Sequence, residues 1–207
     1  MAEAKIAISD TRASFFYGFN PFMPRQPKPG DYPKFLSHFI LGPTHADLKR
    51  VADVIEKVGA EKWKDKWPEV KAQLKGQDKL CLHKGDVSKA GKPEYAGMFY
   101  ISGSGPNLGR TRFSCFHPDG VTQAVEADGL LYSGVRCNAL LALWAQDNPA
   151  GGKRINCTIT GVQHLAHAPA FTSGAAPAAA GEFGNVGGVA GADAPVPSAA
   201  ADDDLLS

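Results

Sequence analysis

The chain has 207 residues, of which 43% are hydrophobic, and a formal net charge of +1. No apolar run approaches the roughly 18 residues of a membrane-spanning helix, and no basic-then-apolar leader opens the chain, so we expect no membrane association, no secretion and reduced cysteines. The charge is uneven: the residues after Ala168 include five acidic side chains and no Lys or Arg, which leaves a net charge of +6 on the rest and favours polyanionic partners.

The N-terminal part is predicted to form strands with an irregular connection. Apolar and polar side chains alternate over 5–19, which predicts one or two strands in which Phe15 and Tyr17 share a face. Five prolines make 20–33 irregular, because proline fixes its backbone angle and donates no backbone hydrogen bond. Another strand is predicted over 34–41.

A single principal helix is predicted after this strand. Thr44 is its expected N-cap, and Asp47 three residues later completes a variant of the capping box. Pro68 interrupts any longer helix, and a short second helix is predicted over 69–75. The apolar stripe of the principal helix consists of Leu48, Val51, Ile55 and Val58.

The rest of the folded part is predicted to be β. One helix among six or seven strands excludes a doubly wound parallel sheet. We therefore predict a mainly β fold, an OB-fold-like antiparallel barrel with one principal helix. The remaining candidate strands are 79–83, 97–102, 110–116, 130–144 and 154–162.

The C-terminal segment 168–207 is predicted to be a disordered linker that carries an acidic tail. It consists mostly of Ala, Gly, Pro and Ser, so it buries too little apolar surface to offset the loss of conformational entropy on folding. The predicted folded domain is therefore 1–167. The residues expected to bind partner proteins are Asp202, Asp203, Asp204, Leu205 and Leu206.

Aromatic rings interleaved with basic residues are the main functional signal. A protein that holds single-stranded nucleic acid without reading its sequence needs rings to stack on bases and cations near phosphates. Phe15, Phe35 and Phe39 are expected to fill the core instead. The stacking candidates are Tyr17, Tyr32, Phe116, Tyr132 and Trp144. The phosphate-binding candidates are Arg12, Arg25, Lys34, Arg110, Arg112, Arg136, Lys153 and Arg154.

Signals for metal binding and catalysis are weak. The pairs Cys81/His83 and Cys115/His117 contain potential zinc ligands, but zinc pairs usually have two to four residues between cysteines, so no metal or cofactor is expected. The glycine-rich stretch 103–109 matches no phosphate-binding motif. No histidine accompanies a nucleophile motif, so we expect no enzyme; a hydrolase with a dispersed triad is the alternative of that class.

Several stretches resemble phage-encoded single-stranded DNA-binding proteins of the OB-fold type. KFLSHFILGPTHADLKRV, at 34–51, is similar to that group's second strand and helix cap. LCLHKGD, at 80–86, and PEYAGMFYISGS, at 93–104, resemble its central segment, and 130–162 resembles its last strands. ADDDLLS stands where the group has its acidic tail, although related tails often finish on an aromatic residue.

The resemblance implies sequence-independent binding of single-stranded DNA during phage replication, recombination or repair, in the cytoplasm of the bacterial host and without catalysis. It also implies that the acidic tail covers the cationic groove in the absence of DNA. Tethering supports this independently, because it gives the tail a high effective concentration at the basic surface. When DNA occupies the groove, the freed tail is expected to recruit replication and recombination proteins.

A different class of function stays open at this point. A structural or assembly protein of a phage would use the same aromatic residues at subunit interfaces. The sequence also leaves open whether the chain forms a homo-oligomer. Binding of oligothymidylate that duplex DNA competes for poorly would separate DNA binding from an assembly role.

Overall fold

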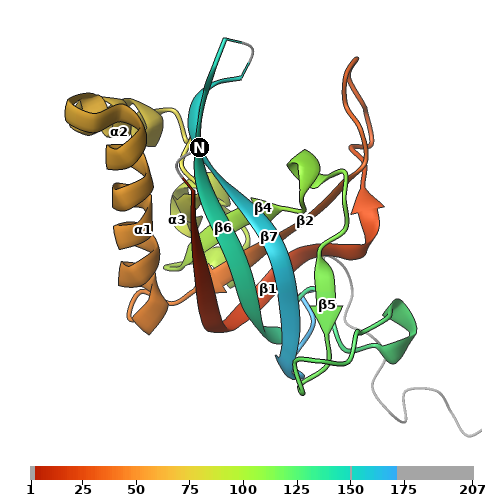
Figure 1. Cartoon of the computed structure of the whole chain (residues 1–207). Coiled ribbons are helices and arrows are strands. Elements are labelled where there is room, and N and C mark those ends of the chain that lie inside the picture. The colour runs from red at the N-terminus through yellow and green to blue at the C-terminus, as the bar shows by residue number, and fades with distance from the viewer. Residues whose placement is uncertain (1–2, 150, 172–207) are drawn as a thin grey trace, which may run out of the picture. The chain divides into compact units, whose positions relative to one another are not determined.

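The computed structural model describes residues 3–149 and 151–171, and Figure 1 shows curved strands with the helices packed at one side. The strands are β1 (Glu3–Phe22), β2 (Lys34–Leu41), β3 (Leu82–Lys84), β4 (Phe99–Ser104), β5 (Ser114–Phe116), β6 (Arg136–Asn148) and β7 (Gly152–Ala166). The α-helices are α1 (Ala46–Trp63), α2 (Trp67–Gly76) and α3 (Gly85–Ser88). Single 3-10 turns are η1 (Lys64–Lys66), η2 (Pro93–Tyr95), η3 (Asn107–Gly109) and η4 (Glu126–Asp128).

Five strands close into a barrel in the order β4-β2-β1-β6-β7. Neighbours in this order are antiparallel, and β7 returns to β4 in parallel at Ser104 and Thr158. The short strands β3 and β5 extend the sheet beside β4 and β7. A closed five-stranded barrel is the architecture of the OB-fold. The predicted mainly β, OB-fold-like barrel with one principal helix is therefore confirmed.

Inward-facing side chains fill the barrel as strand alternation predicts. On β6, Cys137, Leu141 and Leu143 are buried, and Phe39 of β2 is fully buried. Phe35 is half-buried and packs against the same core. The predicted core face of β6 and the core positions of Phe35 and Phe39 are thus confirmed.

The start of β6 differs from the prediction of a strand over 130–144. Gly134 has φ +112°, a conformation that a side chain would strain. A Cβ atom there would also lie 2.5 Å from the carbonyl oxygen of Pro169. The chain therefore turns at Gly134, and β6 begins at Arg136 and continues to Asn148.

β1 is one long strand that bends to pair with β6 through its first half and with β2 through its second. A β-bulge between Ser14 and Tyr17 places Phe15 at φ +48°. The bulge breaks the predicted alternation, because Phe16 packs against the core while Phe15 joins a separate small cluster outside the barrel. Phe15 therefore packs against this second core cluster and not in the interior of the barrel.

The N-cap of α1 is His45 rather than the predicted Thr44. The Nδ1 atom of His45 accepts a hydrogen bond from the backbone N–H of Asp47 at 3.1 Å. The apolar stripe faces the barrel as predicted, with Val51, Ile55 and Val58 buried and Leu48 half-buried. Pro68 stands in the first turn of α2, where its missing N–H costs nothing. Over the described ranges, none of the helices has the length and apolar character of a membrane span.

The predicted strand over 110–116 is shorter than expected. β5 pairs with β7 only through Ser114–Phe116. Arg110 and Arg112 precede the strand, so they do not share a strand face with Phe116 as the alternation suggested.

The segment after β7 folds back onto the barrel. The N–H of Phe171 donates to the carbonyl of Ser133 at 2.9 Å, and Arg12 donates to the carbonyl of Pro169 at 2.6 Å. Residues 168–171 are thus packed rather than free. The remainder of the predicted linker and the tail residues Asp202–Leu206 lie outside the described residues, and the division of the chain into a domain and a tail stays a prediction.

Candidate nucleic-acid interface

A cleft of about 500 Å³ crosses the outer face of the barrel. Outward-facing side chains of β2, β4 and β7 form its floor, and side chains from the adjoining segments form its walls. The floor residues are Leu36, His38, Ser102, Ser104, Asn156 and Thr158. The wall residues include Tyr32, Lys34, Lys79, Leu108, Trp144, Gln146 and Arg154.

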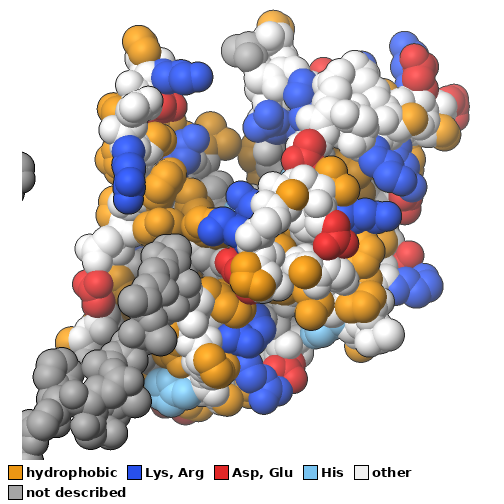
Figure 2. Space-filling model, turned by 180° about the vertical axis from the view of Figure 1, so that it is seen from behind, with side chains coloured by type: hydrophobic (Ala, Val, Ile, Leu, Met, Phe, Trp, Pro, Cys, Tyr) orange, Lys and Arg blue, Asp and Glu red, His pale blue; other side chains and the backbone are white. Residues whose placement is uncertain are grey.

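Two projections stand on either side of this cleft: the β1–β2 connection and the β6–β7 hairpin. Figure 1 shows both rising above the barrel. Figure 2 shows the molecule hollowed between two projections that both carry Lys or Arg side chains. OB-folds bind oligonucleotides on the face of their second and third strands, between the loops that join strands one to two and four to five. Counted in chain order within the barrel, these are β2, β4 and the two projections, so the cleft lies at that position.

Tyr32 provides the aromatic surface of the first wall. Its hydroxyl donates to the carbonyl of Leu108 at 3.0 Å, which holds the ring in place. The guanidinium carbon of Arg110 lies 4.3 Å from the ring centroid, and the Nζ atom of Lys34 lies 4.7 Å from it. A fixed ring with two cations against it combines a surface for base stacking with partners for phosphate.

Trp144 and Arg154 provide the second wall. The indole Nε1 of Trp144 donates to the hydroxyl of Thr158 at 3.0 Å, so the ring is oriented across β6 and β7. Arg154 is exposed and stands opposite Gln146 in the β6–β7 register. Within the described part of the chain, Arg154 forms no ion pair with a carboxylate. Its charge is therefore available to a ligand.

The floor of the cleft is uncharged near His38. Burial, together with the charges of Lys89 and His83, lowers the pKa of His38 to about 3. The neutral imidazole is hydrogen-bonded through Nδ1 to the hydroxyl of Tyr95 at 2.9 Å. Its ring stacks on Tyr100, with centroids 4.8 Å apart. His38 is almost wholly buried, with 9% of its surface exposed, so it contributes a rigid neutral ring to the floor rather than a charge.

The cleft therefore brings together the predicted residues Tyr32, Lys34, Trp144 and Arg154, with Arg110 against Tyr32. Prediction from the rings and cations alone missed the rest of the lining. Strand alternation could have found several of these residues, because outward positions on β2 and β7 follow from Lys34 and Arg154. The residues missed are Leu36, His38, Asp78, Lys79, Leu80, Cys81, His83, Ser102, Gly103, Ser104, Leu108, Gln146, Ile155, Asn156, Cys157 and Thr158.

Arg12 and Tyr132 lie away from the cleft, against the segment that follows β7. The Nε atom of Arg12 donates to the carbonyl of Gly134 at 2.6 Å, and its guanidinium covers the ring of Phe171 at 4.3 Å. The hydroxyl of Tyr132 donates to the carbonyl of Ala168 at 2.8 Å. Both side chains hold this segment in place, and their role in DNA binding stays a prediction.

Arg136 and Lys153 are also outside the cleft. Arg136 forms two hydrogen bonds with the carboxylate of Asp10, at 2.7 and 2.5 Å. The hydrogen bond from Arg136 holds the pKa of Asp10 below its usual value. Lys153 stands opposite Asp147 in the register of the β6–β7 hairpin. An intramolecular partner reduces the availability of Arg136 for phosphate.

The other predicted residues are spread over the first projection and the region of β5. Tyr17 packs on Phe22 with ring centroids 5.0 Å apart, and Arg25 is exposed in the β1–β2 connection. Arg112 covers the ring of Phe19 at 4.8 Å. Phe116 is half-buried on β5. None of these residues lines the cleft, and their binding roles stay predictions.

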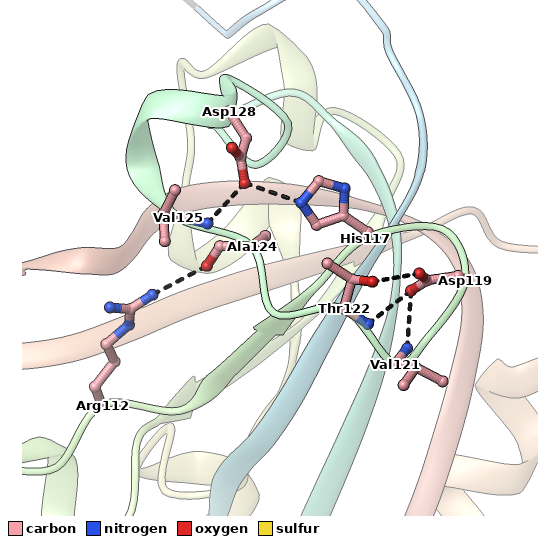
Figure 3. A network of polar contacts seen from close by, with 8 residues as sticks. All are labelled: Arg112, His117, Asp119, Val121, Thr122, Ala124, Val125 and Asp128. Atoms are coloured by element: carbon pink, nitrogen blue, oxygen red, sulfur yellow. Dashed lines mark hydrogen bonds and ion pairs between the residues drawn. The ribbon is translucent and has the colours of Figure 1, made fainter.

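Figure 3 shows a loop after β5 that is fixed by two carboxylates. Asp119 accepts hydrogen bonds from the hydroxyl of Thr122 and from the backbone N–H groups of Val121 and Thr122, which lower its pKa to about 2. Asp128 contacts Nε2 of His117 at 2.9 Å. This arrangement holds the loop rigidly.

The two C-x-H pairs do not converge. His83 contacts Asp78 at 2.7 Å and stacks on Tyr100, while His117 contacts Asp128. Cys81 is a buried free thiol whose pKa is raised to about 12 by burial. Within residues 3–149 and 151–171, no three His, Cys, Asp or Glu side chains are grouped to hold a metal ion.

Comparison with known proteins identifies the family of the chain and two solved structures with the same fold. Residues 4–194 match the family model described as Enterobacter phage Enc34, ssDNA-binding protein. The solved single-stranded DNA-binding protein of bacteriophage Enc34 in complex with ssDNA superimposes with a TM-score of 0.64 at 23% identity, covering 81% of this chain and 89% of that one. The bacteriophage T7 single-stranded DNA-binding protein gp2.5 superimposes with a TM-score of 0.53 at 11% identity, covering 86% and 100%. At these identities the two structures show a common fold. No curated protein sequence matches the chain.

Proposed function

The chain belongs to the family of the Enterobacter phage Enc34 ssDNA-binding protein, and we propose on that premise that it binds single-stranded DNA without sequence preference. One observation supports this most strongly: two fixed aromatic rings face a common cleft between two cationic projections, at the position where OB-folds bind oligonucleotides. Stacking on rings tolerates any base, because every base has a π-face. The protein acts by holding DNA and not by a chemical reaction.

Each wall of the cleft has a role in this proposal. Tyr32 and Trp144 stack on bases, and each stacked base contributes about 1–3 kcal/mol. Lys34, Arg110 and Arg154 bind phosphates. Three phosphate contacts correspond to a slope of about −2 in a plot of log affinity against log salt concentration, because each contact to a single strand contributes about −0.7.

The family supports a proposal for the biological setting. We place the protein in phage DNA replication, recombination or repair in the cytoplasm of the bacterial host. The acidic residues Asp202, Asp203 and Asp204 compete with DNA for the cationic cleft, and with Leu205 and Leu206 they serve as a contact for replication and recombination proteins. The composition supports this, since five acidic and no basic residues follow Ala168.

Fluorescence anisotropy of a labelled oligothymidylate tests the proposal. The full chain should bind it, and affinity should fall with salt along the slope given above. Duplex DNA of equal length should compete poorly, because its bases are already stacked and unavailable to Tyr32 and Trp144. Equal competition by duplex DNA, or no binding at low salt, would contradict the proposal and favour an assembly role for the aromatic surfaces.

A further inference from the structure

A second aromatic ring with two lysines against it lies beyond the end of the cleft floor. Phe15 is half-buried outside the barrel, and the Nζ atoms of Lys89 and Lys92 lie 5.1 and 5.2 Å from its ring centroid. The two lysines come from the segment that joins α3 to β4. Neither forms an ion pair with a carboxylate in the described part of the chain. The group repeats the combination of ring and cations found around Tyr32.

The backbone is distorted to place Phe15 there. A regular β1 would point Phe15 and Phe16 to opposite faces without any bulge, yet Phe15 adopts φ +48° beside the register shift at Ser14. This conformation is an outlier for a bulky residue, and bulges commonly re-aim a side chain next to a functional site. Packing inside the barrel does not account for it, because Phe16 fills the inward position against Phe113. Phe15 instead lies against the small buried cluster of Ile40, Tyr95 and Tyr100.

His38 connects this group with the cleft. Its side chain lines the cleft floor, and its ring meets Phe15 edge to face with centroids 5.1 Å apart. Along β2, Lys34 and His38 point outward four residues apart, a distance of about 13 Å at roughly 3.3 Å per residue. A strand that leaves the Tyr32 wall and follows β2 therefore reaches Phe15 without crossing an acidic side chain of β2.

We propose that Phe15, Lys89 and Lys92 form a second subsite for single-stranded DNA, continuous with the cleft across His38 and occupied by the nucleotides that follow those in the cleft. Phe15 stacks on a base, and the two lysines bind the adjoining phosphates. The inference rests on the proposed function and extends it, since it makes affinity depend on oligonucleotide length.

The test compares oligothymidylates of about 6 and about 16 nucleotides, which span the site sizes of OB-folds. In the full chain, K89Q/K92Q should weaken binding of the long oligomer about 25-fold near 0.1 M salt and reduce its salt slope by about 1.4, since each lost contact contributes about 0.7. Binding of the short oligomer, which fills only the cleft, should be unchanged. F15L should weaken long-oligomer binding by about 5-fold or more.

The matched control is K62Q/K66Q, which removes the same charge from two exposed lysines outside the cleft lining. K62Q/K66Q should therefore bind the long oligomer more tightly than K89Q/K92Q does. Long-oligomer binding by K89Q/K92Q that equals that of the control would overturn the subsite, and so would an equal loss for both oligomers. If the unmodified chain binds neither oligomer, the proposed function itself fails. K89Q/K92Q alters two half-exposed side chains and no buried one, so its result does not depend on whether F15L folds normally.

Discussion

Replacing Trp144 with leucine should weaken single-stranded DNA binding by about 5- to 150-fold. The structure supplies the reason: the indole is half-buried in the wall of the cleft, and its Nε1 donates to Thr158, so the ring is already oriented before DNA arrives. Loss of one base stack removes about 1–3 kcal/mol of binding free energy, which corresponds to that range of dissociation constants. Leucine keeps an apolar side chain on the strand but has no π-face.

Two measurements check this prediction. Anisotropy of a labelled oligothymidylate gives the dissociation constant directly. Intrinsic fluorescence gives an independent signal, because the other two tryptophans, Trp63 and Trp67, are buried where α1 meets α2. Quenching on DNA binding should therefore come from Trp144 and disappear in W144L, while the fluorescence of Trp63 and Trp67 remains.

T158V is the matched control, since it removes the same hydrogen bond but keeps the ring. It should cost about 1 kcal/mol of folding free energy or less and change DNA affinity much less than W144L does. W144F should recover part of the affinity, because a smaller ring still stacks. Unchanged affinity in W144L, or an equal loss in T158V, would refute the assignment of Trp144 as a stacking residue.

Three further outcomes are expected. R154Q should reduce the salt slope of DNA binding by about 0.7, whereas R136Q should reduce it less, because Arg136 is paired with Asp10; equal slopes in salt titrations would contradict this difference. The pKa of His38 is about 3 in the folded chain, against an ordinary value of 6.5. As pH falls below 6.5, the unfolded chain therefore binds a proton that the folded chain excludes. The free energy of unfolding should then fall by up to about 1.4 kcal/mol per pH unit. Urea unfolding of H38Q should show a weaker pH dependence in that window, and a wild-type-like dependence would exclude His38 as its source. Removal of 198–207 should tighten DNA binding at low salt and have little effect at high salt; an unchanged dissociation constant at low salt would exclude competition by the tail.

Strand alternation predicted much of the fold because it depends on local chemistry. Cys137, Leu141 and Leu143 alternate with outward residues, and this pattern is sufficient to identify β6 and its inner face. Boundaries were less predictable where one backbone conformation decides them. Gly134 turns the chain before β6, and His45 takes the capping position because its imidazole reaches the N–H of Asp47.

The site was only partly predictable because its members come from distant segments. Tyr32, Lys34, Trp144 and Arg154 were identifiable as rings and cations, but only barrel closure brings them to one cleft. Arg12 has the same chemistry, yet Pro169 and Phe171 cover it through contacts that no sequence pattern indicates.

The two strands that close the barrel, β4 and β7, meet in the floor of the cleft, so DNA binding there affects the stability of the closed barrel. β4 and β7 pair at a single position, Ser104 with Thr158, whereas β6 and β7 pair along their whole length. Both residues face the cleft. A strand of DNA lying there contacts the two margins of the least extensively paired junction and opposes their separation. DNA binding in the cleft should therefore make local opening of the β4–β7 junction rarer. Hydrogen exchange of the backbone amides along this junction should slow when DNA is bound.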